Sequence, residues 1–201
     1  MSDLNTCKVL ESGNIRLPKG RITFESLLEG QKNEKKPDQK AKHTVSIIFP
    51  KSADLAALLK KVDEVIAENF TAAQLKTTKI KKPFIKVEDQ PKLAELAEEY
   101  PVMLRLDTYS KPGIVGPDGR SEITDASEIY RGRWARPSVF VKYVQYKDDN
   151  GMVNHIIKPY LQNIQLLDHD TPIGGGGRSR AEDDFEAVGV APGGTASSMF
   201  E

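Results

Sequence analysis

The chain has 201 residues, 29 basic and 29 acidic side chains, a formal net charge of zero, and 38% hydrophobic residues. This length fits one domain, or one domain followed by a tail, and the balanced charge argues against a simple polycation. No apolar run of 18 residues and no N-terminal signal pattern occur, so we expect no membrane segment, and the single cysteine, Cys7, fits a reducing compartment.

The first half of the chain predicts strands with one helix between them. Alternating apolar side chains in residues 6–28 predict one or two strands, and residues 29–42 predict a polar loop with five lysines. Residues 43–50 are rich in β-branched side chains, which favours a strand. Residues 53–69 carry apolar side chains at spacings of three and four, with Ser52 as the expected N-cap, and so predict an amphipathic helix.

A second basic run follows this helix. Residues 76–86 contain five lysines and no acid, and two interpretations fit them equally: a surface loop and a contact for nucleic acid. Residues 91–100 predict a short helix, and the alternation in residues 101–110 predicts another strand. Residues 111–120 carry proline and glycine turn signals, which predict a long loop or a hairpin end.

Residues 130–147, YRGRWARPSVFVKYVQYK, are the most unusual stretch of the chain. They hold five basic and five aromatic residues, including the only tryptophan, and no acid. Aromatic faces stack on bases and cations neutralise phosphates, so this mixture is typical of surfaces that bind single-stranded nucleic acid.

From Trp134 onward this stretch alternates in character. The odd positions are mostly small or aliphatic, whereas the even positions include Trp134, Arg136, Phe140, Lys142 and Tyr146. Because successive side chains of a strand point to opposite faces, we expect one face in the core and one aromatic, cationic face outside. An ordinary half-buried strand is the alternative, but solvent-facing sides of strands usually avoid large aromatic residues.

The remaining elements complete a barrel-like pattern. The sequence Asp-Asp-Asn-Gly at residues 148–151 predicts a hairpin turn, and residues 152–167 supply the returning strand. Five or six strands with helical insertions predict a mainly β protein, and we expect an OB-fold five-stranded barrel, a fold whose strand face and loops bind oligonucleotides.

The composition changes at residue 171. Residues 171–201 include four consecutive glycines and an acidic cluster at residues 182–186, and they carry a net charge of −3 against +3 for the rest of the chain. Such a composition predicts a disordered acidic tail. We therefore expect a binding domain at residues 1–170 and a tail at residues 171–201.

The candidate binding residues are aromatic and basic side chains of residues 130–147 and of the strand at residues 101–110. For stacking on bases we expect Trp134, Phe140 and Tyr109, with Tyr146 as a further candidate. For contacts with phosphates we expect Arg105, Arg131, Arg133, Arg136 and Lys142.

An enzyme and an adaptor protein are the alternatives. Four carboxylates, Asp107, Asp118, Asp125 and Glu128, would be the candidates for a metal-dependent nuclease, but no spacing among them places ligands on one face. The three histidines are far apart and have no cysteine partners, so the sequence does not support a zinc site, and we expect no cofactor and no catalysis. An adaptor would instead use the aromatic and cationic face to bind an acidic protein.

The order of motifs resembles a family of tailed-phage single-stranded DNA-binding proteins with an OB fold. The similarity rests on residues 45–51, 111–120, 122–139, 161–175 and 181–185, and so spans nearly the whole chain. Its most specific parts are Tyr-x-Gly-x-Trp-x-Arg at residues 130–136 and Leu-Gln-Asn-Ile-Gln at residues 161–165.

This resemblance implies a role in phage DNA replication or recombination in the cytoplasm of the host bacterium. It also implies self-association on single-stranded DNA and a tail that contacts other replication or recombination proteins. The chain departs from the simplest pattern of such binders because its acidic cluster is internal and its last residues are Met199, Phe200 and Glu201.

Overall fold

The computed structural model describes residues 4–34, 38–148 and 150–173. Five long strands dominate it: β3 (Gly20–Gln31), β4 (Lys42–Phe49), β7 (Val102–Thr108), β9 (Trp134–Lys147) and β10 (Val153–Leu166). Strand β3 pairs with β4, β4 with β7, β7 with β10, β10 with β9, and β9 again with β3. The ring of pairings is closed, and only the β7–β10 contact within it is parallel. The expected five-stranded barrel is therefore confirmed.

The barrel forms because its strands alternate in polarity. In β4, Val45, Ile47 and Phe49 are buried in the main core, and in β7 Leu104 and Leu106 join them. The intervening side chains point to the other face of each strand, where Ile48 and Met103 are buried in a second, smaller apolar cluster. Strand β9 follows the same rule, with Ala135, Val139 and Val141 in the core, which confirms the predicted alternation of this strand.

One long helix covers part of the barrel. Helix α1 (Ala56–Asn69) follows β4 and packs Leu58, Val62 and Val65 into the core. It begins three residues later than expected, and the Oδ1 atom of Asp54, rather than Ser52, accepts the hydrogen bond from the Ala56 amide. The short helix α2 (Ala72–Leu75) comes next and is closed by a capping box between Thr71 and Gln74.

The remaining elements are short. They are the strands β1 (Lys8–Val9), β2 (Ile15–Arg16), β5 (Ile80–Lys81), β6 (Ile85–Lys86) and β8 (Gly113–Val115), and the 3₁₀ turns η1 (Val87–Asp89), η2 (Ala94–Leu96) and η3 (Ala126–Glu128).

Two expectations need correction here. The segment 91–100 forms only a 3₁₀ turn, closed by i to i+3 bonds such as Leu96 N–H to the Leu93 carbonyl. Residues 111–120 are not wholly a loop, because β8 pairs in parallel with β10.

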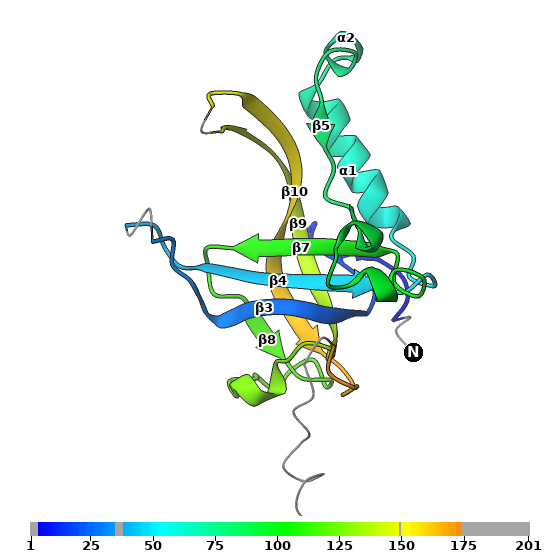
Figure 1. Cartoon of the computed structure of the whole chain (residues 1–201), viewed down its shortest axis with the longest axis vertical. Coiled ribbons are helices and arrows are strands. Elements are labelled where there is room, and N and C mark those ends of the chain that lie inside the picture. Colours follow the sequence, from blue (N-terminus) through cyan, green and yellow to red (C-terminus); the bar gives the residue numbers. More distant parts are fainter. Residues whose placement is uncertain (1–3, 35–37, 149, 174–201) are drawn as a thin grey trace, which may run out of the picture.

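Strands β9 and β10 extend beyond the barrel as a curved hairpin (Figure 1). We call this extension beyond the barrel the arm. The pairing of the two strands is continuous from Lys147–Val153 to Ala135–Leu166, with one irregularity near Leu161. The predicted turn is confirmed: Asp148 Oδ1 accepts from the amides of Asn150 and Met152. In the same view β3, β4 and β7 lie as a stacked layer across the lower parts of β9 and β10, and α1 runs beside the arm.

The last described residues lie against the start of β9. The Leu167 amide donates to the Trp134 carbonyl at 2.8 Å, and the Ile173 amide donates to the Arg131 carbonyl at 3.1 Å. Ile173 is 9% exposed, so residues 171–173 pack on the barrel. The predicted tail from residue 174 onward lies outside the described residues.

Candidate nucleic-acid interface

A continuous row of outward-facing side chains crosses the barrel. Tyr160 of β10 pairs with Phe140 of β9 and with Asp107 of β7, and Asp107 pairs in turn with Thr44 of β4. Directly paired residues of a sheet point to the same face. The outer surfaces of β4, β7, β9 and β10 therefore form one continuous face, which we call the barrel face.

Aromatic rings are exposed along this face and the arm. Phe140, Tyr109 and Tyr146 are 39%, 45% and 43% exposed, and Tyr160 is half-buried. Burial, together with the nearby charge of Asp107, raises the pKa of Tyr160, so its phenol stays neutral at physiological pH. The structure thus presents three of the four predicted stacking residues to solvent.

Lysines surround these rings. Lys142 lies over the Phe140 ring at 5.3 Å, and Lys158 lies over the Tyr160 ring at 4.9 Å. Lys42 and Lys158 both bind the buried carboxylate of Asp107, at 2.8 and 2.7 Å. One acid neutralises only one of its two lysines, so the cluster keeps a net positive charge beside the rings.

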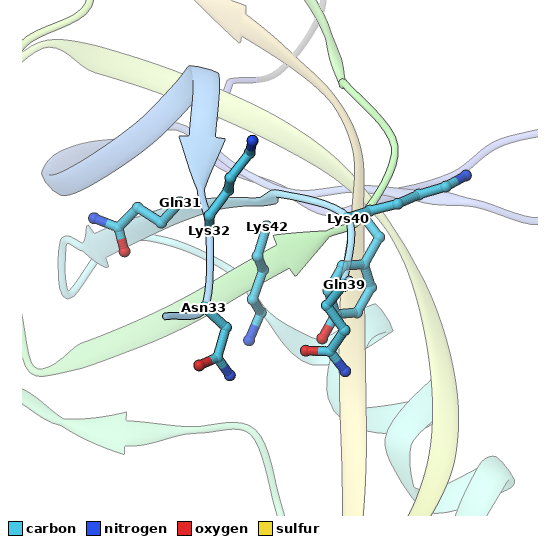
Figure 2. Close-up of a pocket in the computed structure, with 7 residues that line it drawn as sticks. Gln31, Lys32, Asn33, Gln39, Lys40 and Lys42 are labelled. Carbon is cyan, nitrogen blue, oxygen red and sulfur yellow. The ribbon is translucent and has the colours of Figure 1, made fainter. Parts of the chain in front are cut away.

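The loop between β3 and β4 adds further lysines next to Tyr109. A cavity of about 260 Å³ lies here, and the residues that line it are drawn in Figure 2: Gln31, Lys32, Asn33, Gln39, Lys40, Lys42 and Tyr109. Lys32 and Lys40 are both exposed. In OB folds, oligonucleotides bind to the loop between strands 1 and 2, to the loop between strands 4 and 5, and to the face of strands 2 and 3. The five barrel strands in chain order are β3, β4, β7, β9 and β10, so the loop between β3 and β4 is the first of these.

Two of the predicted arginines meet at a second hollow on the barrel. A cavity of about 470 Å³ is lined by Arg105 and Arg131, and by apolar side chains that include Phe24, Leu93 and Met103. Both arginines are exposed. Arg105 pairs across the sheet with Ser46, and Ser46 with Phe24, so this hollow lies on the same outer surface as the barrel face. Lys92 also lines it, so the hollow combines three cations with apolar side chains.

Trp134 lies apart from these groups and is half-buried against the second apolar cluster of the protein. Its Nε1–H donates to Asp170 Oδ2 at 2.8 Å, its ring lies 6.3 Å from Tyr100, and Lys19 lies 5.0 Å over it. These contacts engage the indole within the protein itself.

Arg133 is buried, at 3% exposure. Its guanidinium donates to the Leu167 carbonyl at 3.0 Å and to Glu128 Oε2 at 2.6 Å, and it contacts His169. A guanidinium enclosed in this way holds the chain together and does not reach a strand of DNA on the surface. The expected phosphate contact therefore does not fit the position of Arg133.

Arg136 is half-buried on the outer side of β9, beside β8. Its Nε–H donates to Gln165 Oε1 at 2.7 Å, and Gln165 donates to the carbonyls of Gly116 and Pro117. This bonding ties β9 and β10 to the loop that follows β8.

Sequence reasoning missed Tyr160, Lys158 and Lys42. A usable signal was present for two of them. The turn at residues 148–151 fixes the register of the arm, and that register places Tyr160 opposite Phe140 and Lys158 opposite Lys142. Lys42 was counted only as one of the lysines of a polar loop, because nothing local indicates its pairing with Asp107.

The four carboxylates considered for a nuclease have separate structural partners. Asp107 binds two lysines, Asp118 accepts from the Arg120 and Ser121 amides, Asp125 accepts from the Ser127 amide, and Glu128 binds Arg133. Among the described residues, no three His, Cys, Asp or Glu side chains form a group that could hold a metal ion. Within the same ranges, no helix is long and apolar enough to cross a membrane.

Three comparisons relate this chain to known proteins. No curated protein sequence matches it at a significant level. The fold is similar to that of the single-stranded DNA-binding protein from bacteriophage Enc34. A C-terminally truncated form of that protein aligns with a TM-score of 0.62 and 16% identity, over 86% of this chain and 95% of the other. The same protein in complex with single-stranded DNA aligns with a TM-score of 0.58 and 15% identity, over 86% and 96%.

A second phage protein shares the fold. The single-stranded DNA-binding protein gp2.5 of bacteriophage T7 aligns with a TM-score of 0.55 and 11% identity, over 82% of this chain and 97% of the other. A family profile described as Enterobacter phage Enc34, ssDNA-binding protein, matches residues 13–193, which is most of the sequence. The chain therefore belongs to the family of the single-stranded DNA-binding protein of Enterobacter phage Enc34.

Proposed function

We propose that this protein binds single-stranded DNA without sequence preference through the barrel face and the adjoining hollow. The observation that carries this proposal is the interleaving of exposed aromatic rings with lysines on one continuous surface. Membership of the Enc34 family supports it, because the relative was solved with single-stranded DNA bound.

The mechanism combines stacking with charge neutralisation. Bases stack on Phe140, Tyr109, Tyr146 and Tyr160, each contributing roughly 1–3 kcal/mol whatever the base, because every base has a π-face. Phosphates are neutralised by the cations beside the rings and at the hollow, namely Lys42, Lys142, Lys158, Arg105 and Arg131. Three to five such contacts give a slope of log affinity against log salt of roughly −2 to −3.5.

A salt titration with three ligands tests this function. Affinities for oligo(dT), for a duplex of equal length and for the matching RNA are measured at several salt concentrations. We expect the tightest binding to oligo(dT) and a slope in the stated range. Failure to bind oligo(dT), with binding to an acidic protein instead, would favour the adaptor. Metal-dependent loss of the oligonucleotide would favour a nuclease.

The cellular role follows from this activity. We place the protein in the cytoplasm of an infected bacterium, where it coats and protects single strands during phage DNA replication or recombination and self-associates on DNA. Its acidic tail recruits replication or recombination proteins or competes with DNA for the cationic face. We propose a role in binding without catalysis, and the structural partners of the four candidate carboxylates support it.

A further inference from the structure

The basic run at residues 76–86 lies along the arm. Strand β5, Ile80–Lys81, pairs in parallel with β10, with Ile80 opposite His155 and Lys81 opposite Ile156. It pairs with the same edge of β10 that meets β7 nearer the barrel, because the other edge pairs with β9 throughout. The run therefore continues the sheet that carries the barrel face.

The two sides of this segment have different neighbours. Ile80 packs against the main core, and Lys82 Nζ binds Asp63 of α1 at 2.7 Å, so the even positions face the helix. Lys81 shares the opposite side with its partner Ile156, and alternation along the extended chain places Lys79 there too. Ile156 has the same parity on β10 as Lys158 and Tyr160, which belong to the barrel face.

The charges on this side are available. Lys79 and Lys81 are exposed, and neither forms an ion pair with any residue in the described part of the chain. The neighbouring pairs on the arm are Val144 with Ile156 and Tyr146 with Asn154, and Tyr146 is 43% exposed. An exposed ring next to unneutralised lysines repeats the composition of the barrel face.

We propose that Lys79 and Lys81 extend the single-stranded DNA site from the barrel face onto the arm, where they neutralise phosphates of nucleotides that stack at Tyr146. This extension rests on the proposed function and adds a second segment to the same path. A long single strand engages both segments, whereas a short one is held by the barrel face alone.

The test compares two lengths of oligo(dT), about 6 and about 16 nucleotides, which bracket roughly what one OB fold covers. The variant is Lys79→Gln with Lys81→Gln in the full chain. On the long oligonucleotide we expect its Kd to rise roughly fivefold per lost contact and its salt slope to fall by about 1.4, or about 0.7 for each phosphate. On the short oligonucleotide we expect wild-type affinity.

The control is Lys82→Gln, on the same segment but on the side that faces α1. It removes an exposed ion pair and should leave both affinities unchanged, and urea unfolding checks that all variants fold alike. Wild-type Kd and slope for the double variant on the long oligonucleotide would overturn the extension while leaving the proposed function intact. An equal loss on both lengths would also overturn it. Failure of the wild-type protein to bind oligo(dT) of either length would refute the proposed function instead.

Discussion

Arg131 and Arg133 stand two positions apart and have opposite surroundings. Arg131 is exposed at the rim of the hollow, whereas Arg133 is 3% exposed and bonded to Leu167 and Glu128. We predict that Arg133→Ala lowers the free energy of unfolding by about 2–3 kcal/mol, because the Leu167 carbonyl loses its charged donor. Glu128 is 39% exposed and regains water, which limits the loss. Urea unfolding measures it.

Arg131→Ala is the matched variant. It should keep wild-type stability and reduce the salt slope of oligo(dT) binding by about 0.7, the contribution of one phosphate. If Arg133→Ala folds normally and loses the affinity while Arg131→Ala does not, the two assignments are reversed.

Phe140 offers a direct optical test of stacking. In a Trp134→Phe, Phe140→Trp variant, the only indole lies on the barrel face, and we predict strong fluorescence quenching on adding oligo(dT). The wild-type protein is the control, since its Trp134 is half-buried and bonded to Asp170, so it should respond less. Phe140→Ala should weaken binding by about 1–3 kcal/mol. Strong quenching of the wild-type protein without quenching of the variant would place the DNA at Trp134 instead.

Cys7 gives a prediction about pH. Burial raises the pKa of its thiol from 9.0 to about 11. The folded state therefore holds this proton more tightly than the unfolded state, and the stability that follows is present below pH 9 and is lost as the pH rises towards 11. At pH 8 only about one thiol in a thousand is ionised, so alkylation should be slow and its rate should rise with a midpoint near 11. A midpoint near 9 would contradict the burial of Cys7.

For single residues, the sequence predicted which side chains of β9 are exposed, but it did not predict which of them form contacts with distant parts of the chain. Alternation placed Phe140, Lys142 and Tyr146 outside, because that rule is local. The sequence analysis also placed Arg133 and Trp134 in the site, but the positions of these side chains depend on contacts with Leu167 and Asp170, more than 30 positions away. Spacing along one strand holds no information about such contacts.

The elements show why the glycine of the Tyr-x-Gly-x-Trp motif is needed. Gly132 has φ of +105°, and a Cβ there would lie 2.5 Å from the Thr171 carbonyl oxygen and 2.9 Å from Pro172 Cα. Gly151 in the turn of the arm also has positive φ, at +77°, but a Cβ there would meet nothing within 4 Å. A substitution at Gly151 therefore tests backbone strain alone, whereas one at Gly132 also displaces the packed residues 171–173.

We predict that Gly132→Ala destabilises the protein more than Gly151→Ala does. The turn position should lose only the cost of an unfavourable φ, about 1 kcal/mol. The Gly132 substitution adds the displacement of residues 171–173, including the buried Ile173, and should cost roughly 3 kcal/mol or more. Urea midpoints of the two variants measure this, and equal losses would show that residues 171–173 contribute nothing to stability.

Element prediction succeeded where patterns were long. The strands at residues 102–108 and 134–147 and the helix at residues 56–69 have clear periods, and the strand at residues 42–49 is rich in β-branched side chains. It failed for two elements of only three residues each, the 3₁₀ turn at residues 94–96 and the strand at residues 113–115. Strand β8 exists because β10 lies beside it, and no local pattern of three residues can indicate that neighbour.

The whole molecule is a barrel closed by contacts between distant parts of the chain. The pairings of β3 with β9 and of β7 with β10 join segments that are far apart in sequence, so strand counting suggested a barrel without specifying its closure. Closure brings the loop of β3 and β4, the face of β7 and the arm into one surface. The net charge is divided along the sequence: residues 1–170 are mildly basic and residues 171–201 are acidic.

Because of this division of charge, we predict that the acidic tail competes with DNA for the basic body at low salt. Residues 174–201 carry five acids and two arginines, a net charge of −3, and follow directly on Ile173, which packs on the barrel. Deleting residues 174–201 should raise the affinity for oligo(dT) at low salt and have little effect at high salt, where screening removes the attraction. A full-length variant with Glu182, Asp183, Asp184 and Glu186 replaced by their amides should reproduce the gain if charge is the cause. Unchanged affinity in both proteins would assign the tail to partners or solubility alone, and a gain in the deletion only would point to steric occlusion.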